Sequence, residues 1–160
     1  MTGFENRQAP LPDGLHCIDL PQSLPGFRRF ISAWFFRDAL GRRILIDPGP
    51  ANTIPLLLRE LDPLTDGVDL ILLTHIHLDH AGGLGQLCSR FPKARVLTHP
   101  KAFRHLTNPE KLWNASVETL GDVARTYGPP VPEAYHSREN AVAAPPPKTD
   151  QAGRLSVVPL

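Results

Sequence analysis

The chain has 160 residues, of which 41% are hydrophobic and 21% are charged. This length and composition fit one globular domain with its own core, and they argue against a fibrous or membrane-embedded protein. The formal net charge is +1 and both signs are interspersed, so neither nucleic acid nor an anionic membrane surface is an expected partner.

The chain starts with Met-Thr-Gly-Phe-Glu-Asn-Arg-Gln, which lacks a charged segment followed by an apolar core. No later run approaches the roughly 18 apolar residues of a membrane-spanning helix. Cys17 and Cys88 are too few for a disulfide framework. We therefore expect a cytoplasmic protein.

The first third of the chain predicts mostly β-structure. Residues 1–14 are polar and interrupted by proline and glycine, which indicates a flexible N-terminus. Weak alternation predicts a strand at 15–20. Aromatic and β-branched residues predict a hairpin of strands 30–36 and 42–47. A helix then follows, with Asn52 or Thr53 as its cap, Pro55 in its first turn and leucines on its buried side.

The middle of the chain predicts a βαβ unit. Residues 68–73 form a continuous apolar run, typical of a central strand covered on both faces. Residues 84–91 repeat apolar side chains at helical spacing, and 94–98 predict a second strand. A right-handed crossover makes the two strands parallel. His99 therefore emerges at the sheet edge where the first strand also ends.

The last third changes in composition. Residues 108–128 predict one longer helix, whose apolar stripe of Trp113, Val117, Leu120, Ala124 and Tyr127 we interpret as core. Residues 129–154 are rich in proline and alanine, which predicts a linker or a disordered tail. Residues 155–160 are a candidate terminal strand. The main domain is thus expected to span residues 15–128.

A polar cluster follows the central strand: His75, His77, Asp79 and His80 lie within six positions. Three imidazoles and a carboxylate at the end of a buried strand indicate a bound cation. Neutral imidazole together with carboxylate suits zinc, manganese or iron, whereas calcium and magnesium prefer oxygen alone.

The spacing supports a shared site. In an extended segment, positions 75, 77 and 79 project to one side. His80 points elsewhere unless the chain turns there, and Gly82 and Gly83 permit such a turn.

Two motifs resemble those of a known family. Residues 74–83, Thr-His-Ile-His-Leu-Asp-His-Ala-Gly-Gly, resemble the signature of the metallo-β-lactamase-fold hydrolases. Residues 44–50, Ile-Leu-Ile-Asp-Pro-Gly-Pro, resemble the upstream strand of that family, and the resemblance covers about residues 15–128. It implies an α/β (α+β) fold, the N-terminal half of a metallo-β-lactamase-like αββα sandwich, with a mixed sheet and helices on one face.

The resemblance also implies a hydrolase. His75 and His77 would hold one metal, and Asp79 and His80 a second. Two Zn²⁺ per complete site are expected, with Mn²⁺ or Fe²⁺ as alternatives. A metal-bound hydroxide, oriented by Asp79 as the catalytic carboxylate, would attack an ester, lactone, thioester or similar bond of a small molecule. Asp47 would not touch the metal and would fix a ligand imidazole by a hydrogen bond.

The family completes its site with later ligands: a His in a Pro-Gly-His context, an Asp and a final His. These motifs do not occur in this chain, so the sequence resembles half of the family's domain, as a truncated form would. His99 and His105 are candidate substitute ligands. The missing half would leave a sheet face exposed, which a homodimer would cover.

Three other functions compete with a hydrolase. A non-catalytic remnant would keep metal or partner binding without turnover. A di-iron redox protein on the same fold is a weaker alternative, because such relatives place Glu where this chain has His77. A zinc nuclease would need a basic surface, which the balanced charge does not supply.

Overall fold

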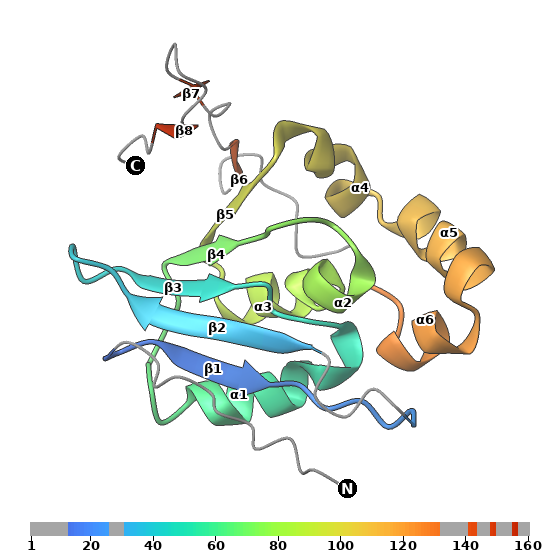
Figure 1. Ribbon diagram of the computed structural model, residues 1–160, viewed down its shortest axis with the longest axis horizontal. Helices are drawn as coiled ribbons and strands as arrows, with labels where there is room; N and C mark the ends of the chain where they lie inside the picture. Colours follow the sequence, from blue (N-terminus) through green and yellow to red (C-terminus); the bar gives the residue numbers. More distant parts are fainter. Residues whose placement is uncertain (1–12, 26–30, 132–140, 144–147, 150–154, 157–160) are drawn as a thin grey trace, which may run out of the picture.

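A mixed six-stranded sheet is the frame of the fold (Figure 1). The computed structural model describes residues 13–25, 31–131, 141–143, 148–149 and 155–156. Neighbouring strands follow the order of the chain: β1 (His16–Asp19), β2 (Ser32–Arg37), β3 (Arg43–Ile46), β4 (Leu70–Leu72), β5 (Arg95–Thr98) and β6 (Ala141–Ala143). The pairs β1–β2 and β2–β3 are antiparallel, and the pairs from β3 to β6 are parallel.

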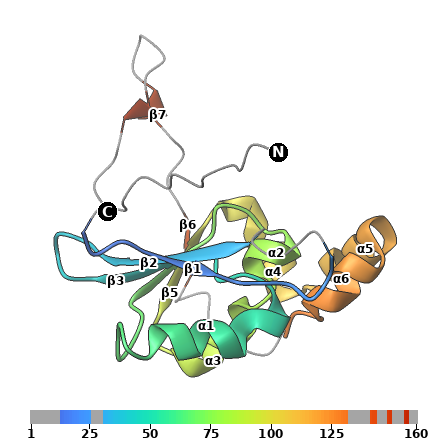
Figure 2. The same ribbon diagram turned by 60° about the horizontal axis from the view of Figure 1, so that its bottom comes forward.

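The helices cover one face of this sheet and extend past one end of it. They are η1 (Ala51–Thr53), α1 (Ile54–Leu61), α2 (Leu78–Ala81), α3 (Leu84–Arg90), η2 (Pro100–Ala102), α4 (Phe103–Thr107), α5 (Glu110–Leu120) and α6 (Asp122–Tyr127). Figure 2 shows α1 and α3 beneath the sheet, with α5 and α6 beyond its end. Within the described part of the chain, no helix combines the length and apolar character needed to cross a membrane.

The two faces of the sheet differ in burial because side chains alternate along each strand. The main core lies on the helix-covered face and contains fully buried Phe35, Leu45 and Ile71. On the opposite face, Ile44, Leu70 and Leu97 form a smaller buried cluster, and half-buried Phe36, Ile46 and Leu72 pack against it. Both faces are therefore apolar, and helices cover only one of them.

The predicted mixed α/β sheet with helices on one face is confirmed, as are the 30–47 hairpin and the parallel βαβ unit. The single helix expected at 108–128 is wrong. Gly121, with a φ of 55°, separates α5 from α6. The core interpretation of its stripe fails for Leu120, which is 49% exposed, while Ala124 and Tyr127 are buried.

The C-terminal segments are described in part. Residues 141–143, inside the 129–154 segment predicted as a linker or tail, form β6 and pair with β5. Leu155 and Ser156, in the candidate terminal strand, form β8 and pair with β7 (Lys148–Thr149) in a separate two-stranded sheet. Most of the predicted flexible N-terminus, residues 1–12, lies outside the described residues.

An ion pair joins the beginnings of β3 and β4. The guanidinium of Arg43 donates to both carboxylate oxygens of Asp69, at 2.9 and 2.6 Å, and to Asp66 at 2.7 Å. The backbone N–H of Arg43 also donates to Asp69, at 2.8 Å. These hydrogen bonds from Arg43 lower the pKa of Asp69 to about 2. The pair thus fixes where two parallel strands start.

We expect Asp69→Asn to lower the free energy of unfolding by about 1 kcal/mol at pH 7, because the carboxylate is partly exposed. The folded pKa lies below the unfolded value of about 4, so the stabilisation is present above pH 4 and disappears as the pH falls toward 2. Urea unfolding of both proteins at pH 7, 5 and 3 measures this. Asp66→Asn is the control with a smaller expected effect, since Asp66 is 90% exposed. A difference that stayed constant with pH would contradict the assignment.

Neighbouring residues of β3 test the difference between the two sheet faces. Leu45→Ala should lower the free energy of unfolding by roughly 2–5 kcal/mol, because Leu45 is fully buried in the main core. Ile46→Ala on the half-buried face should cost less than half as much. Equal losses in urea titrations would show that the second face is as tightly packed as the first.

Candidate metal centre

The site is built where β3 and β4 end side by side. Asp47 directly follows β3, and its backbone N–H donates to the carbonyl of Leu72 at 3.0 Å, which continues the pairing with β4. Asp47 has a φ of 46°, in the left-handed region that few residues other than glycine, asparagine and aspartate adopt. The strained backbone turns its carboxylate toward the loop that follows β4.

Asp47 is 7% exposed, and its carboxylate accepts hydrogen bonds from three donors. The backbone N–H of Thr74 donates at 2.8 Å, the Thr74 hydroxyl at 2.6 Å and His80 Nδ1 at 3.0 Å. Burial raises the pKa of Asp47, but the hydrogen bonds from His80 and Thr74 outweigh burial and hold the pKa below its ordinary value. Asp47 is therefore an anion that fixes both the loop and the imidazole.

Backbone contacts hold the Asp47 loop against α2. The N–H of Gly49 donates to the carbonyl of His80 at 3.1 Å, and the N–H of Gly83 donates to the carbonyl of Gly49 at 2.9 Å. A Cβ at Gly83 would lie 2.1 Å from the side chain of Ile54, and one at Gly49 would lie 2.3 Å from Leu20. A side chain at either position would therefore displace Ile54 or Leu20, and Gly49 also has a φ of 86°, which favours glycine.

Three of the predicted ligands come together. One ligand atom from each of His75, Asp79 and His80 lies within 4.8 Å of the others, and His80 Nε2 is 3.4 Å from Asp79 Oδ2. Hydrogen bonds from His80 to Asp47 and Asp79 raise the pKa of His80 to about 9. Burial, reinforced by the nearby His80 and His77, lowers the pKa of His75.

The hydrogen bonds define which ring nitrogens are free to bind a cation. His80 donates from Nδ1 to Asp47, so its Nε2 faces Asp79. The Thr74 hydroxyl donates to Asp47, so its oxygen accepts from His75 Nδ1 at 3.0 Å. In both imidazoles Nε2 is then the nitrogen left to bind a metal, and that of His80 lies beside the carboxylate of Asp79. Two oriented imidazoles and a carboxylate fit a divalent transition metal, which would replace the proton between His80 and Asp79.

His77 lies next to this cluster and outside it. Its ring packs edge-on against His75 with 4.8 Å between centroids, but its nitrogens are not part of the group of three. The chain turns at His77, where α2 begins, and not at the two glycines as the sequence suggested. Asp79 and His80 therefore reach the site from a helical turn, while His75 reaches it from the extended segment.

The two proposed substitute ligands are engaged elsewhere. His99 accepts at Nδ1 from the backbone N–H of Lys101 at 3.2 Å, at the start of η2. His105 accepts at Nε2 from Arg104 at 3.0 Å. Within the described residues, neither joins the cluster of His75, Asp79 and His80.

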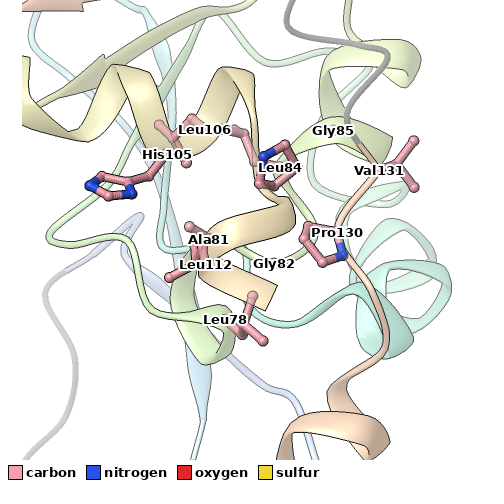
Figure 3. Close-up of a pocket in the computed structure, with 11 residues that line it drawn as sticks. Leu78, Ala81, Gly82, Leu84, Gly85, His105, Leu106, Leu112, Pro130 and Val131 are labelled. Carbon is pink, nitrogen blue, oxygen red and sulfur yellow. The ribbon is translucent and has the colours of Figure 1, made fainter. Parts of the chain in front are cut away.

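The side of α2 away from the ligands is packed tightly. A small cavity of about 20 Å³ lies there, with Leu78 and Ala81 of α2 on its wall and His105 across from Pro130 and Val131 (Figure 3). A Cβ on Gly85 would lie 2.1 Å from the carbonyl oxygen of Val131. The 130–131 segment thus packs closely on the start of α3 and helps to hold α2 in place.

Two residues near the site were not assigned to it from the sequence. The Thr74 hydroxyl connects Asp47 to His75 by hydrogen bonds. In the sequence, its position just before the first histidine of the motif is the feature that could have indicated this role. Tyr127, interpreted as core, is 3% exposed, and burial together with the charge of Asp79 raises its pKa. It therefore lies close to the ligands although about fifty residues separate it from them in the chain.

A sequence profile of the Metallo-beta-lactamase superfamily matches residues 26–154. The chain belongs to this superfamily. The match extends beyond residue 128, where the recognisable motifs end, and it includes β6.

Similar proteins include several hydrolases. A UPF0173 metal-dependent hydrolase of Aeropyrum pernix is 42% identical over 66 residues, which is 41% of this chain and 26% of the relative. A hydroxyacylglutathione hydrolase of Serratia proteamaculans is 33% identical over 117 residues, covering 64% of this chain and 45% of the relative. The chain thus spans less than half the length of these relatives.

A solved structure shows the same fold. An archaeal metallo-beta-lactamase superfamily protein from Sulfolobus tokodaii has a TM-score of 0.67 and 25% identity, over 88% of this chain and 52% of that protein. The described sheet and helices therefore correspond to about half of a complete superfamily structure.

We expect Asp47→Asn to weaken divalent-metal binding by about 10- to 100-fold, because an amide no longer holds His80 by a charge-assisted hydrogen bond. Competition with a chromophoric chelator measures the dissociation constant. Asp62→Asn, at the end of α1 and outside the site, is the control. Unchanged metal affinity in Asp47→Asn would show that Asp47 does not orient a ligand.

Proposed function

We propose that this chain is a zinc-dependent hydrolase that cleaves an ester, lactone or thioester bond in a small molecule. The observation that carries the proposal is the group of His75, Asp79 and His80, held by the buried Asp47. The hydrolases among its relatives support this reaction class.

Each described residue of the site has a part in this proposal. His75 and His80 would bind the metal through Nε2, and Asp47 keeps the His80 ring in that orientation. A bound divalent metal supplies Lewis acidity and lowers the pKa of water. Asp79 keeps a lowered pKa because hydrogen bonding to His80 outweighs its burial, so its carboxylate is ionised and can accept a hydrogen bond from an attacking water.

His77 is the nearest further imidazole, since its ring contacts His75. A catalytic zinc needs about three protein ligands and an open position. His75, Asp79 and His80 together supply three ligands, which is enough for one zinc ion. His77 would supply a further ligand to a second ion. We therefore propose at least one zinc per chain.

Metal content of the purified chain tests the proposal most directly. We expect one to two zinc ions per wild-type chain by mass spectrometry, and loss of most of this metal in His80→Ala. His77→Ala should lose only the second ion. His99→Ala is the matched control, because His99 bonds to the backbone of η2 and should leave metal content unchanged. Unchanged metal in His80→Ala would overturn the assignment.

Hydrolysis of simple esters and thioesters by the zinc-loaded chain separates the two main functions. Turnover that disappears in Asp79→Asn would support a hydrolase. Retained zinc without turnover of any of these substrates would instead support a non-catalytic metal-binding protein.

A further inference from the structure

A groove of about 490 Å³ opens directly beside the proposed ligands. His77 and Asp79 lie at one side of it, and residues of α5 and α6 form the opposite wall. Figure 1 shows these two helices beyond the end of the sheet, with α6 next to α2. The volume lies in the range of sites that hold small molecules.

One face of α5 lines the groove. Leu112, Ala115, Ser116 and Thr119 lie at helical spacing and face it. The Thr119 hydroxyl donates to the carbonyl of Ala115 at 2.8 Å, so its hydrogen is already used within the helix. This face therefore presents methyl and methylene groups more than free polar groups.

The end of α5 and helix α6 are also apolar where they line the groove. Leu120 is 49% exposed, Val123 is half-buried, and the ring of Tyr127 is buried beside Asp79. An exposed leucine on the wall of a groove is an apolar contact available to a ligand. The wall is thus apolar from α5 to α6.

Apart from Asp79, no Asp, Glu, Lys or Arg lines this groove among the described residues. The carboxylate of Asp79 lies at the metal end. The charged residues Glu110, Lys111 and Glu118 of α5 are exposed and lie outside the lining. A ligand group that carries a carboxylate would be desolvated here without a cationic partner.

We infer that this groove binds the apolar acyl group of the substrate, with the bond to be cleaved held at His75, Asp79 and His80. This inference rests on the proposed function and adds the substrate class to it. Substrates with a neutral alkyl or aromatic acyl group are favoured. Acyl groups that end in a carboxylate, and bulky charged acyl groups, are excluded because the groove offers no counter-charge.

Binding of metal-chelating hydroxamates measures the groove without relying on turnover. Calorimetry of the zinc-loaded 160-residue chain would compare acetohydroxamic acid, octanohydroxamic acid and the monohydroxamate of suberic acid. Each fully buried methylene contributes about three- to fourfold in affinity, so in an open groove the octanoyl compound should bind at least about 30-fold more tightly than the acetyl compound. The carboxylate at the end of the suberic compound should remove most of this gain.

Two bulky substitutions on α5 test whether the acyl chain binds in the groove. Ala115→Phe fills the groove and should reduce the affinity for octanohydroxamic acid by at least about tenfold. Asn114→Phe places the same side chain on an exposed position outside the lining and should keep the wild-type affinity. Leu120→Asn, at an exposed position that tolerates a polar residue, should reduce the difference between octanoyl and acetyl compounds.

The outcomes distinguish this inference from the function on which it rests. Equal affinities for the acetyl and octanoyl compounds, or equal effects of Ala115→Phe and Asn114→Phe, would overturn the acyl groove alone. Failure of every hydroxamate to bind the zinc-loaded chain would overturn the proposed function together with it.

Discussion

The rest of the site depends on the hydrogen bonds that the carboxylate of Asp47 accepts. This carboxylate joins the end of β3 to the loop after β4 through Thr74, and to α2 through His80. A buried carboxylate without these donors would be costly, so the chain can adopt this geometry only if both segments are in place. The hydrogen bonds between Gly49, His80 and Gly83 fix the same two segments through their backbones. The same hydrogen bonds therefore orient His80 and hold the local fold.

Much of the frame could be predicted from the sequence because its signals are local. The apolar run before His75 defined a central strand, and the helical repeat after Gly83 required a parallel partner strand. The pairing of histidines and a carboxylate indicated a cation from residue chemistry alone. The resemblance to the superfamily, confirmed by the match to residues 26–154, added the place of Asp47 next to these ligands.

The parts that could not be predicted depend on contacts between distant segments. The start of α2 at Leu78 decides that Asp79 and His80 share a site with His75, and α2 packs closely on the 49–50 loop, which lies about thirty residues earlier in the chain. Similarly, the apolar stripe at 108–128 reads as core by spacing. Its break at Gly121 places Leu120 on the wall of a groove instead of in the interior. Periodicity identifies an apolar face but not what that face contacts.

The proposed metal ligands and the α5–α6 wall of the groove come from separate stretches of the chain. The proposed ligands lie between His75 and His80 and form one side of the groove, whereas the opposite wall lies between Leu112 and Tyr127. Under the proposed function, substitutions in α5 can therefore change which substrates bind while Asp47 and Thr74 still support the proposed ligands. In such an arrangement, substrate selectivity can diverge through gradual substitutions in α5 and α6. For protein engineering, these two helices are a region that can be randomised without changing any of the proposed metal ligands.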